Sequence, residues 1–148
     1  MSIVKTFAAA IALALPAAAL SQGAISMSGL MTVQEGGSGL IRGLVSDNPA
    51  AGTFFAAFDT GALAQVRSTD VASVSIPGIT AFFSGRAIVV VNGPGGPREV
   101  RARYMVMVDD LAGTQFPDQF FIRVDTSEGQ TYIRHGRLTR GDIVVTLP

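Results

Sequence analysis

Short runs of alternating apolar and polar residues follow one another from Ala24 to the end of the chain, separated by Gly, Pro, Asn and Asp at a spacing of roughly ten residues. The alternation places every second side chain on one face, as in a half-buried β-strand, and no window has the periodicity of an amphipathic helix. We therefore expect an all-β domain of about ten antiparallel strands, closed as a single β-sandwich or a partly open β-barrel. The expected strands are Ile25–Val33, Gly39–Ser46, Thr53–Asp59, Ala64–Thr69, Ala72–Ile76, Thr80–Val91, Glu99–Val108, Gln119–Asp125, Gln130–Leu138 and Asp142–Leu147.

The clearest element is a central hairpin. Its first arm ends in Ile88–Val91, and Asn92-Gly93 with the following glycines permits the positive φ angles of a tight turn. The second arm has two different faces. The face expected in the core carries Val100, Ala102, Tyr104, Val106 and Val108, and the opposite face carries Arg101, Arg103, Met105 and Met107. We expect the arginine end of that second face to be solvated and the methionine end to be covered.

The first 21 residues have a different pattern. Lys5 precedes an apolar run from Phe7 to Leu20, and Ala19 and Ser21 supply the small side chains that signal peptidase requires. The run is shorter than an ordinary membrane span. The sequence thus predicts a secretory signal peptide over residues 1–21 and a single domain over residues 22–148, in the periplasm or outside the cell.

Composition narrows the classes of partner. The chain has no cysteine, so an exported domain must fold without disulfides and has no thiol for a lipid anchor. Without Lys5, ten arginines face eleven acidic residues. This balance predicts neither nucleic acid nor an anionic membrane as a partner, and we expect no stable membrane insertion after cleavage. A transmembrane barrel is disfavoured because paired aromatic girdles are missing.

Several motifs resemble one kind of exported bacterial domain. They are an A-x-F-S-G strand within Ala81–Ala87, an Asn92-Gly93 turn, a strand that ends at Asp109-Asp110, a D-x-F-x-I-R-V strand within Pro117–Val124 and a closing G-x-L-x-x-G-D-I element at Gly136–Ile143. In these features the chain is similar to the post-COAP family. The resemblance implies a small exported β-domain and no assigned reaction.

The loop between the predicted strands Glu99–Val108 and Gln119–Asp125 is the best candidate for chemistry. It brings together Asp109, Asp110 and Asp118, and Ca²⁺ needs several such oxygen ligands. The spacing is not that of an EF-hand, and aspartate also forms turns by accepting hydrogen bonds from its own backbone. The sequence therefore leaves a calcium site and loop-capping aspartates as alternatives, and no other cofactor is expected.

Catalytic chemistry has little support. His135 is the only histidine, which excludes a histidine-rich zinc site, and no Gly-x-Ser-x-Gly motif accompanies it. The tripeptide Arg140-Gly141-Asp142 is explained by a turn before the last strand, although some adhesion receptors bind the same three residues. Four arginines near the C-terminus could gather to bind an acidic polysaccharide: Arg123, Arg134, Arg137 and Arg140. Their acidic neighbours Asp125, Glu128 and Asp142 favour a mixed, solvated face instead.

These observations favour an exported, non-enzymatic β-domain that acts as a surface, structural or interaction module, with a cell-surface polymer or another exported protein as its partner. The first alternative is a binder of a small lipophilic or carbohydrate ligand, in which Met105, Met107 and Phe121 line a barrel mouth. A small hydrolase that uses the acidic loop is the third possibility.

Overall fold

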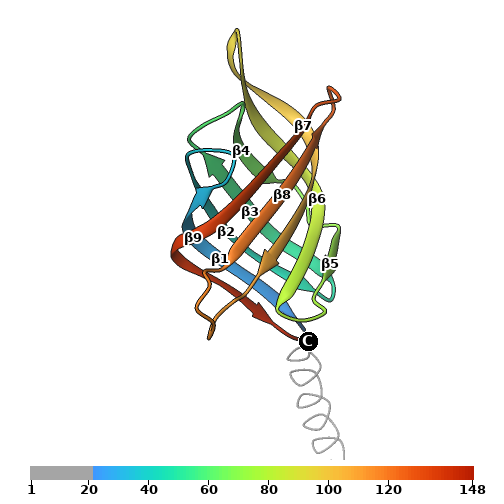
Figure 1. Cartoon of the computed structure of the whole chain (residues 1–148). Helices are drawn as coiled ribbons and strands as arrows, with labels where there is room; N and C mark the ends of the chain where they lie inside the picture. The colour runs from blue at the N-terminus through green and yellow to red at the C-terminus, as the bar shows by residue number, and fades with distance from the viewer. Residues whose placement is uncertain (1–21) are drawn as a thin grey trace, which may run out of the picture.

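Nine antiparallel strands and no helix form the secondary structure of residues 22–148, the part of the chain that the computed structural model describes (Figure 1). The predicted signal peptide, residues 1–21, lies outside the described residues. The strands are β1 (Ala24–Val33), β2 (Ser38–Asp47), β3 (Ala50–Phe58), β4 (Leu63–Ser68), β5 (Ser73–Ser75), β6 (Thr80–Gly93), β7 (Gly96–Asp109), β8 (Gln119–Thr126) and β9 (Thr131–Thr146). The all-β prediction is confirmed.

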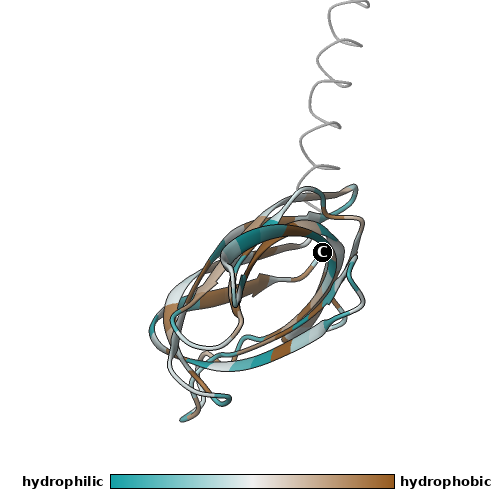
Figure 2. Cartoon of the chain, turned by 90° about the horizontal axis from the view of Figure 1, so that it is seen from above, coloured by the Kyte–Doolittle hydropathy of each residue, from teal (hydrophilic) through white to brown (hydrophobic). Residues whose placement is uncertain are grey.

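The sheet closes into a barrel through two strands that are not consecutive in sequence. Neighbouring strands follow the order β4-β3-β2-β1-β9-β8-β7-β6-β5, and β4 also pairs with β6. Eight strands therefore form a closed ring, which appears as an oval in the end-on view of Figure 2, and β5 is one extra strand. β4 and β5 lie along successive stretches of the same edge of β6. Of the two predicted architectures, the barrel is the correct one.

Side chains fill the barrel. Every strand of the ring contributes buried apolar residues, and four aromatic rings pack together within this core. The ring centroid of Phe54 lies 5.4 Å from that of Phe83, 5.7 Å from that of Tyr104 and 5.9 Å from that of Phe120. An eight-stranded barrel has an interior just wide enough for such packing. The core therefore stabilises the fold without disulfides, as the cysteine-free composition requires.

Tyr104 is the polar member of this aromatic group. Its hydroxyl donates a hydrogen bond to the backbone carbonyl of Asp70 at 2.9 Å, and burial raises the pKa of the phenol. Asp70 lies in the segment that joins β4 to β5, so the bond fastens this segment to the inside of the wall. Within residues 22–148, no buried side-chain nitrogen or oxygen lacks a hydrogen-bond partner.

β9 is one long strand where the sequence predicted two. The predicted strands Gln130–Leu138 and Asp142–Leu147 are joined because Thr139 is the extra residue of a β-bulge opposite Leu30 and Met31 of β1. Gly141, expected in a turn, lies inside the strand with φ of 85°.

The described residues include no helix with the length and hydropathy needed to cross a membrane.

Candidate functional site

The outer wall formed by β7, β8 and β9 carries the side chains that strand alternation turns away from the core. The antiparallel register aligns them in two rows, one extended by a residue of β1 and the other by a residue that directly follows β1. The first row contains Asp109, Gln119, Arg137 and Thr32, and the second contains Met107, Phe121, His135 and Gln34. Residues distant in sequence thereby form one continuous surface.

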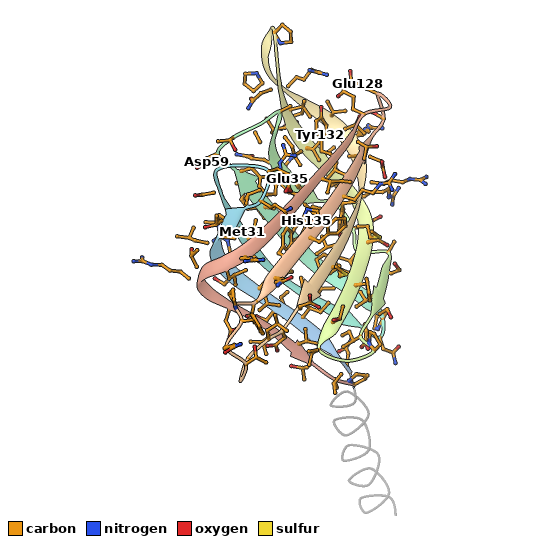
Figure 3. All side chains as sticks on the ribbon, viewed as in Figure 1. Met31, Glu35, Asp59, Glu128, Tyr132 and His135 are labelled. Atoms are coloured by element: carbon orange, nitrogen blue, oxygen red, sulfur yellow. The ribbon has the colours of Figure 1, made fainter. Side chains whose placement is uncertain are left out.

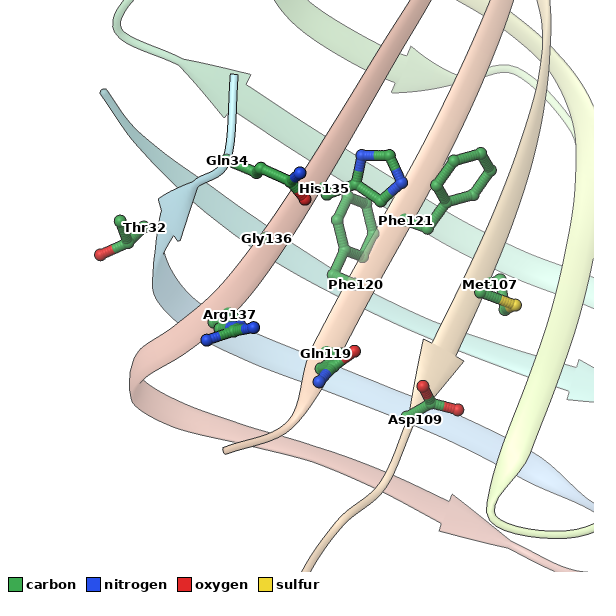
Figure 4. Close-up of a pocket in the computed structure, with 10 residues that line it drawn as sticks. All are labelled: Thr32, Gln34, Met107, Asp109, Gln119, Phe120, Phe121, His135, Gly136 and Arg137. Atoms are coloured by element: carbon green, nitrogen blue, oxygen red, sulfur yellow. The ribbon is translucent and has the colours of Figure 1, made fainter. Parts of the chain in front are cut away.

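A hollow of about 390 Å³ lies over these two rows, and we call it the wall pocket (Figure 4). The side chains of both rows line it, together with Phe120 and Gly136. Met107 and Phe121 are half-buried and supply apolar surface, whereas His135, Gln119 and Arg137 are exposed. The wall pocket thus combines an apolar floor with polar groups around it, the usual composition of a ligand site.

His135 is held in place from two sides. Its ring centroid lies 4.9 Å from that of Phe121, and its Nδ1 lies 3.3 Å from Oε1 of Glu35, in the turn between β1 and β2 (Figure 3). The backbone N–H of His135 donates to the same carboxylate oxygen. In the neutral tautomer with the proton on Nδ1, this nitrogen donates a hydrogen bond to Glu35. Nε2 is then free to accept a hydrogen bond from a ligand.

The polar rim of the wall pocket includes three planar groups, an amide, a carboxylate and a guanidinium, whose chemistry suits paired hydrogen bonds to a ligand. Gln119 lies between the carboxylate of Asp109 and the guanidinium of Arg137 in the first row. Oδ1 of Asp109 accepts a hydrogen bond from the hydroxyl of Thr80, which fixes the carboxylate on the wall. Amide, carboxylate and guanidinium groups beside an aromatic ring are suited to a ligand ring that bears hydroxyl groups.

The structure separates the three aspartates of the predicted calcium site. Asp110 and Asp118 lie together in the loop between β7 and β8, whereas Asp109 is on the outer wall. The third carboxylate of the cluster is Asp142 of β9, and one ligand atom from each of the three lies within 4.8 Å of the others. The sequence did not reveal Asp142 as a member, because its approach depends on the register of the last strand.

Hydrogen bonds to the backbone account for the positions of the loop aspartates. Oδ1 of Asp118 accepts from the N–H of Leu111 at 2.8 Å, and Oδ2 accepts from the N–H of Ile143 at 2.9 Å. Oδ2 of Asp110 accepts from the N–H of Val145 at 3.0 Å. The two carboxylates thereby satisfy alternate N–H groups along an edge of β9 that β8 does not reach.

Within this cluster, the neighbouring carboxylates raise the pKa of Asp142. A hydrogen bond with Asp118 raises the pKa of Asp142, and partial burial and repulsion from Asp118 and Asp110 act in the same direction. Asp142 is exposed, and its backbone N–H is not among the groups that the loop carboxylates bind. The geometry of the cluster therefore assigns a structural task to Asp110 and Asp118 and none to Asp142.

The four C-terminal arginines do not gather at one place. Arg134 points to the inner side of the wall, where its Cζ lies 5.8 Å from the centre of the Phe58 ring. Arg123 pairs with Asp125 at 3.1 Å, and Arg137 lines the wall pocket. Arg140 lies beside the β-bulge of β9. The four arginines therefore form no single cluster, because alternation along β9 sends Arg134 and Arg137 to opposite faces.

The methionines predicted at a barrel mouth also lie elsewhere. Met105 and Met107 follow one another on the outside of β7, and Phe121 is beside Met107 on β8. Within the described chain no element covers Met105, which is 43% exposed. Binding in the style of a lipocalin interior has no geometric support, since the inward faces of the same strands are packed together.

Comparisons with protein-family models, with curated proteins and with solved structures find no match for this chain. The similarity to the post-COAP family stays a prediction from the sequence motifs.

Proposed function

We propose that the protein is a non-enzymatic, extracytoplasmic binding module that holds sugar units of a surface polymer in the wall pocket. The observation that carries this proposal is the arrangement around Phe121: an exposed hollow with an aromatic and thioether floor, bordered by Gln119, Asp109 and Arg137. A pyranose ring presents apolar C–H groups on its faces and hydroxyl groups around its edge. The pocket is complementary to both features.

The position of the pocket supports a polymer as the ligand. The hollow lies on the outside of the wall and is bounded by strands, so a chain could enter and leave along the surface. Inside the barrel, by contrast, the aromatic rings around Phe54 pack against one another. A module that binds a cell-surface polymer needs an open surface site such as the wall pocket.

The chemistry of the same residues favours binding over turnover. The hydrogen-bonding partner of the His135 ring is the Glu35 carboxylate, and no serine or threonine hydroxyl within residues 22–148 bonds to this ring. Asp110 and Asp118, the carboxylates of the alternative hydrolase, each accept two backbone N–H groups. Among residues 22–148, His135 therefore lacks the bonded hydroxyl that a serine triad needs, which favours binding over triad hydrolysis.

Binding to neutral trisaccharides tests this proposal. Cellotriose, maltotriose and chitotriose are titrated into the protein by calorimetry, with Phe121→Ala as the test variant and Phe116→Ala as the matched control. Phe116 is an exposed phenylalanine of the loop between β7 and β8 and does not line the pocket. We expect at least one trisaccharide to bind, and Phe121→Ala to weaken that binding by about tenfold while Phe116→Ala leaves it unchanged.

Two results would contradict the proposal. One is the absence of binding for all three trisaccharides. The other is equal binding by the wild type and Phe121→Ala, because a ligand that does not contact Phe121 does not occupy the wall pocket.

A further inference from the structure

Three arginines surround a second hollow on the outer wall, nearer the turn between β6 and β7. Arg86 belongs to β6, and Arg101 and Arg103 belong to β7. Arg86 and Arg103 are direct cross-strand partners, and Arg101 is two residues from Arg103 on the same face. The hollow has a volume of about 590 Å³, and we call it the arginine pocket.

The positive charge of this pocket is only partly compensated. Asp70 neutralises Arg86, whereas Arg101 and Arg103 form no ion pair with any residue of 22–148. Asp125 is the cross-strand partner of Arg103. Its carboxylate is already bound by Arg123 and by the hydroxyl of Thr131. Like charges directly opposite on two strands repel, so an anion in the pocket would relieve an unfavourable contact.

Hydrogen bonds and an ion pair with Asp70 fix the position of Arg86. Nε and Nη2 of its guanidinium lie 2.7 Å and 2.6 Å from Oδ2 of Asp70, whose Oδ1 accepts the backbone N–H of Arg86 at 2.7 Å. The Asp70 carbonyl is bound by Tyr104 from the core, and a side chain at Gly85 would lie 2.3 Å from that carbonyl oxygen. Because Gly85 has no side chain, the segment around Asp70 can approach the backbone of β6 closely. The Nη1 donors of Arg86 are left for a ligand.

The hydrogen bonds from Arg86 also keep Asp70 ionised. The backbone N–H of Arg86 is the largest influence that lowers the pKa of Asp70, followed by the guanidinium. Thr69, Thr126 and Ser127 add hydroxyl groups to the pocket lining, and Asp125 adds a carboxylate that Arg123 and Thr131 already bind. The pocket thus combines one oriented guanidinium, two guanidiniums without carboxylate partners, three hydroxyl groups and one carboxylate that Arg123 already binds.

We propose that the arginine pocket is a second binding site, which takes the tetrahedral oxyanion of a phosphate or sulfate ester. Guanidinium groups donate paired, charge-assisted hydrogen bonds to such oxyanions, and hydroxyl groups donate to the remaining oxygens. The site is independent of the proposed function, because its three arginines are not part of the wall pocket.

An NMR titration with inorganic phosphate and inorganic sulfate at constant ionic strength tests the site. We expect saturable shifts of the backbone amide signals of Arg86, Arg101, Arg103 and Ser127 with at least one anion. Arg101→Gln and Arg103→Gln should each weaken binding by about tenfold. Arg42→Gln is the matched control, since Arg42 is an exposed arginine of β2 that is not part of this pocket and should leave the affinity unchanged.

Glycerol 1-phosphate and methyl sulfate then distinguish the two sources of the oxyanion. Tighter binding of either ester supports the proposal and identifies the ester. The proposal is overturned if no anion gives saturable shifts, or if Arg42→Gln weakens binding as much as Arg103→Gln does, since the interaction would then be general charge attraction. Neither result bears on the trisaccharide titration, which the residues of the wall pocket decide.

Discussion

Asp118 connects the loop between β7 and β8 to the second half of β9: its Oδ2 accepts the backbone N–H of Ile143 at 2.9 Å, across 25 residues of sequence. The backbone carbonyl of Asp118 also accepts the N–H of Leu138 at 3.0 Å. β8 pairs with the first half of β9 only, so the second half of β9 would present unpaired N–H groups at this edge. The loop between β7 and β8 supplies side-chain acceptors in place of a strand.

Removing the Asp118 carboxylate should destabilise the fold. Asp118→Ala leaves the half-buried N–H groups of Leu111 and Ile143 without their acceptor, which predicts a loss of about 1–3 kcal/mol in the free energy of unfolding. Urea denaturation followed by circular dichroism measures this loss. Asp109→Ala is the control, because Asp109 accepts a hydroxyl and no backbone group in the same loop. Equal losses in the two variants would contradict the role assigned to Asp118.

The raised pKa of Asp142 predicts that its contribution to the stability of the fold falls as the pH rises. Its pKa in the folded state is raised above the ordinary value of 3.8, mainly by the hydrogen bond with Asp118, so the folded protein holds this proton more tightly than the unfolded chain. The contribution of Asp142 to stability is fully present below that value and is lost as the pH rises through the raised pKa. Asp142→Asn should therefore stabilise the protein at neutral pH, by less than about 1 kcal/mol because solvent screens this exposed group.

Denaturation of both proteins at several pH values checks this prediction. The gain from Asp142→Asn should shrink as the pH falls below the ordinary carboxyl range. A variant that is less stable than the wild type at neutral pH would show that the Asp142 charge is not repelled by Asp118.

Calcium should have little effect on stability. The oxygens of Asp110 and Asp118 already accept backbone N–H groups, which explains their positions without an ion. The melting temperature is expected to be the same in EDTA and in millimolar Ca²⁺. A rise in Ca²⁺ that Asp118→Asn abolishes would show that the cluster of Asp110, Asp118 and Asp142 binds the cation, because a ligand of the folded state must raise the melting temperature.

The backbone around Gly141 leaves no room for a side chain. This packing explains the glycine of Arg140-Gly141-Asp142 without an adhesion receptor. Its φ is 85°, and a Cβ at this position would lie 1.9 Å from the carbonyl oxygen of Ser28. Gly141→Ala is expected to lower the free energy of unfolding by about 2–4 kcal/mol. Gly95→Ala is the control, since a Cβ there meets no atom within 4 Å. Similar stability of the two variants would contradict the close contact between β9 and β1.

The sequence predicts the local elements well because they depend on local alternation. The hairpin of β6 and β7 has the expected core face, with Val106 buried, and the expected outward arginines. The join within β9 was missed because Gly141 has the conformation of a turn residue, although it lies in a bulged strand. A positive φ at glycine is compatible with both structures, so residue type alone does not distinguish them.

The candidate site was harder to predict because it depends on contacts between distant strands. The closure of β4 onto β6 bypasses β5, and no local pattern specifies it. Phe121, His135 and Gln34 come together only when the register of β8, β9 and the end of β1 is known. The available indication was that Phe121 and His135 lie at outward positions of their strands, and Gln34 directly follows β1. The same reasoning could not place Asp142 beside Asp118.

The most direct test of the proposed function is an NMR titration that maps where a bound trisaccharide contacts the wall. The wall pocket predicts shifts at the backbone amides of Met107, Gln119, Phe121 and His135, with Phe54 and Phe83 of the core unaffected. Shifts centred on the core aromatics would place the ligand inside the barrel. Shifts at an unrelated surface, or none for any trisaccharide, would contradict a sugar site in the wall pocket.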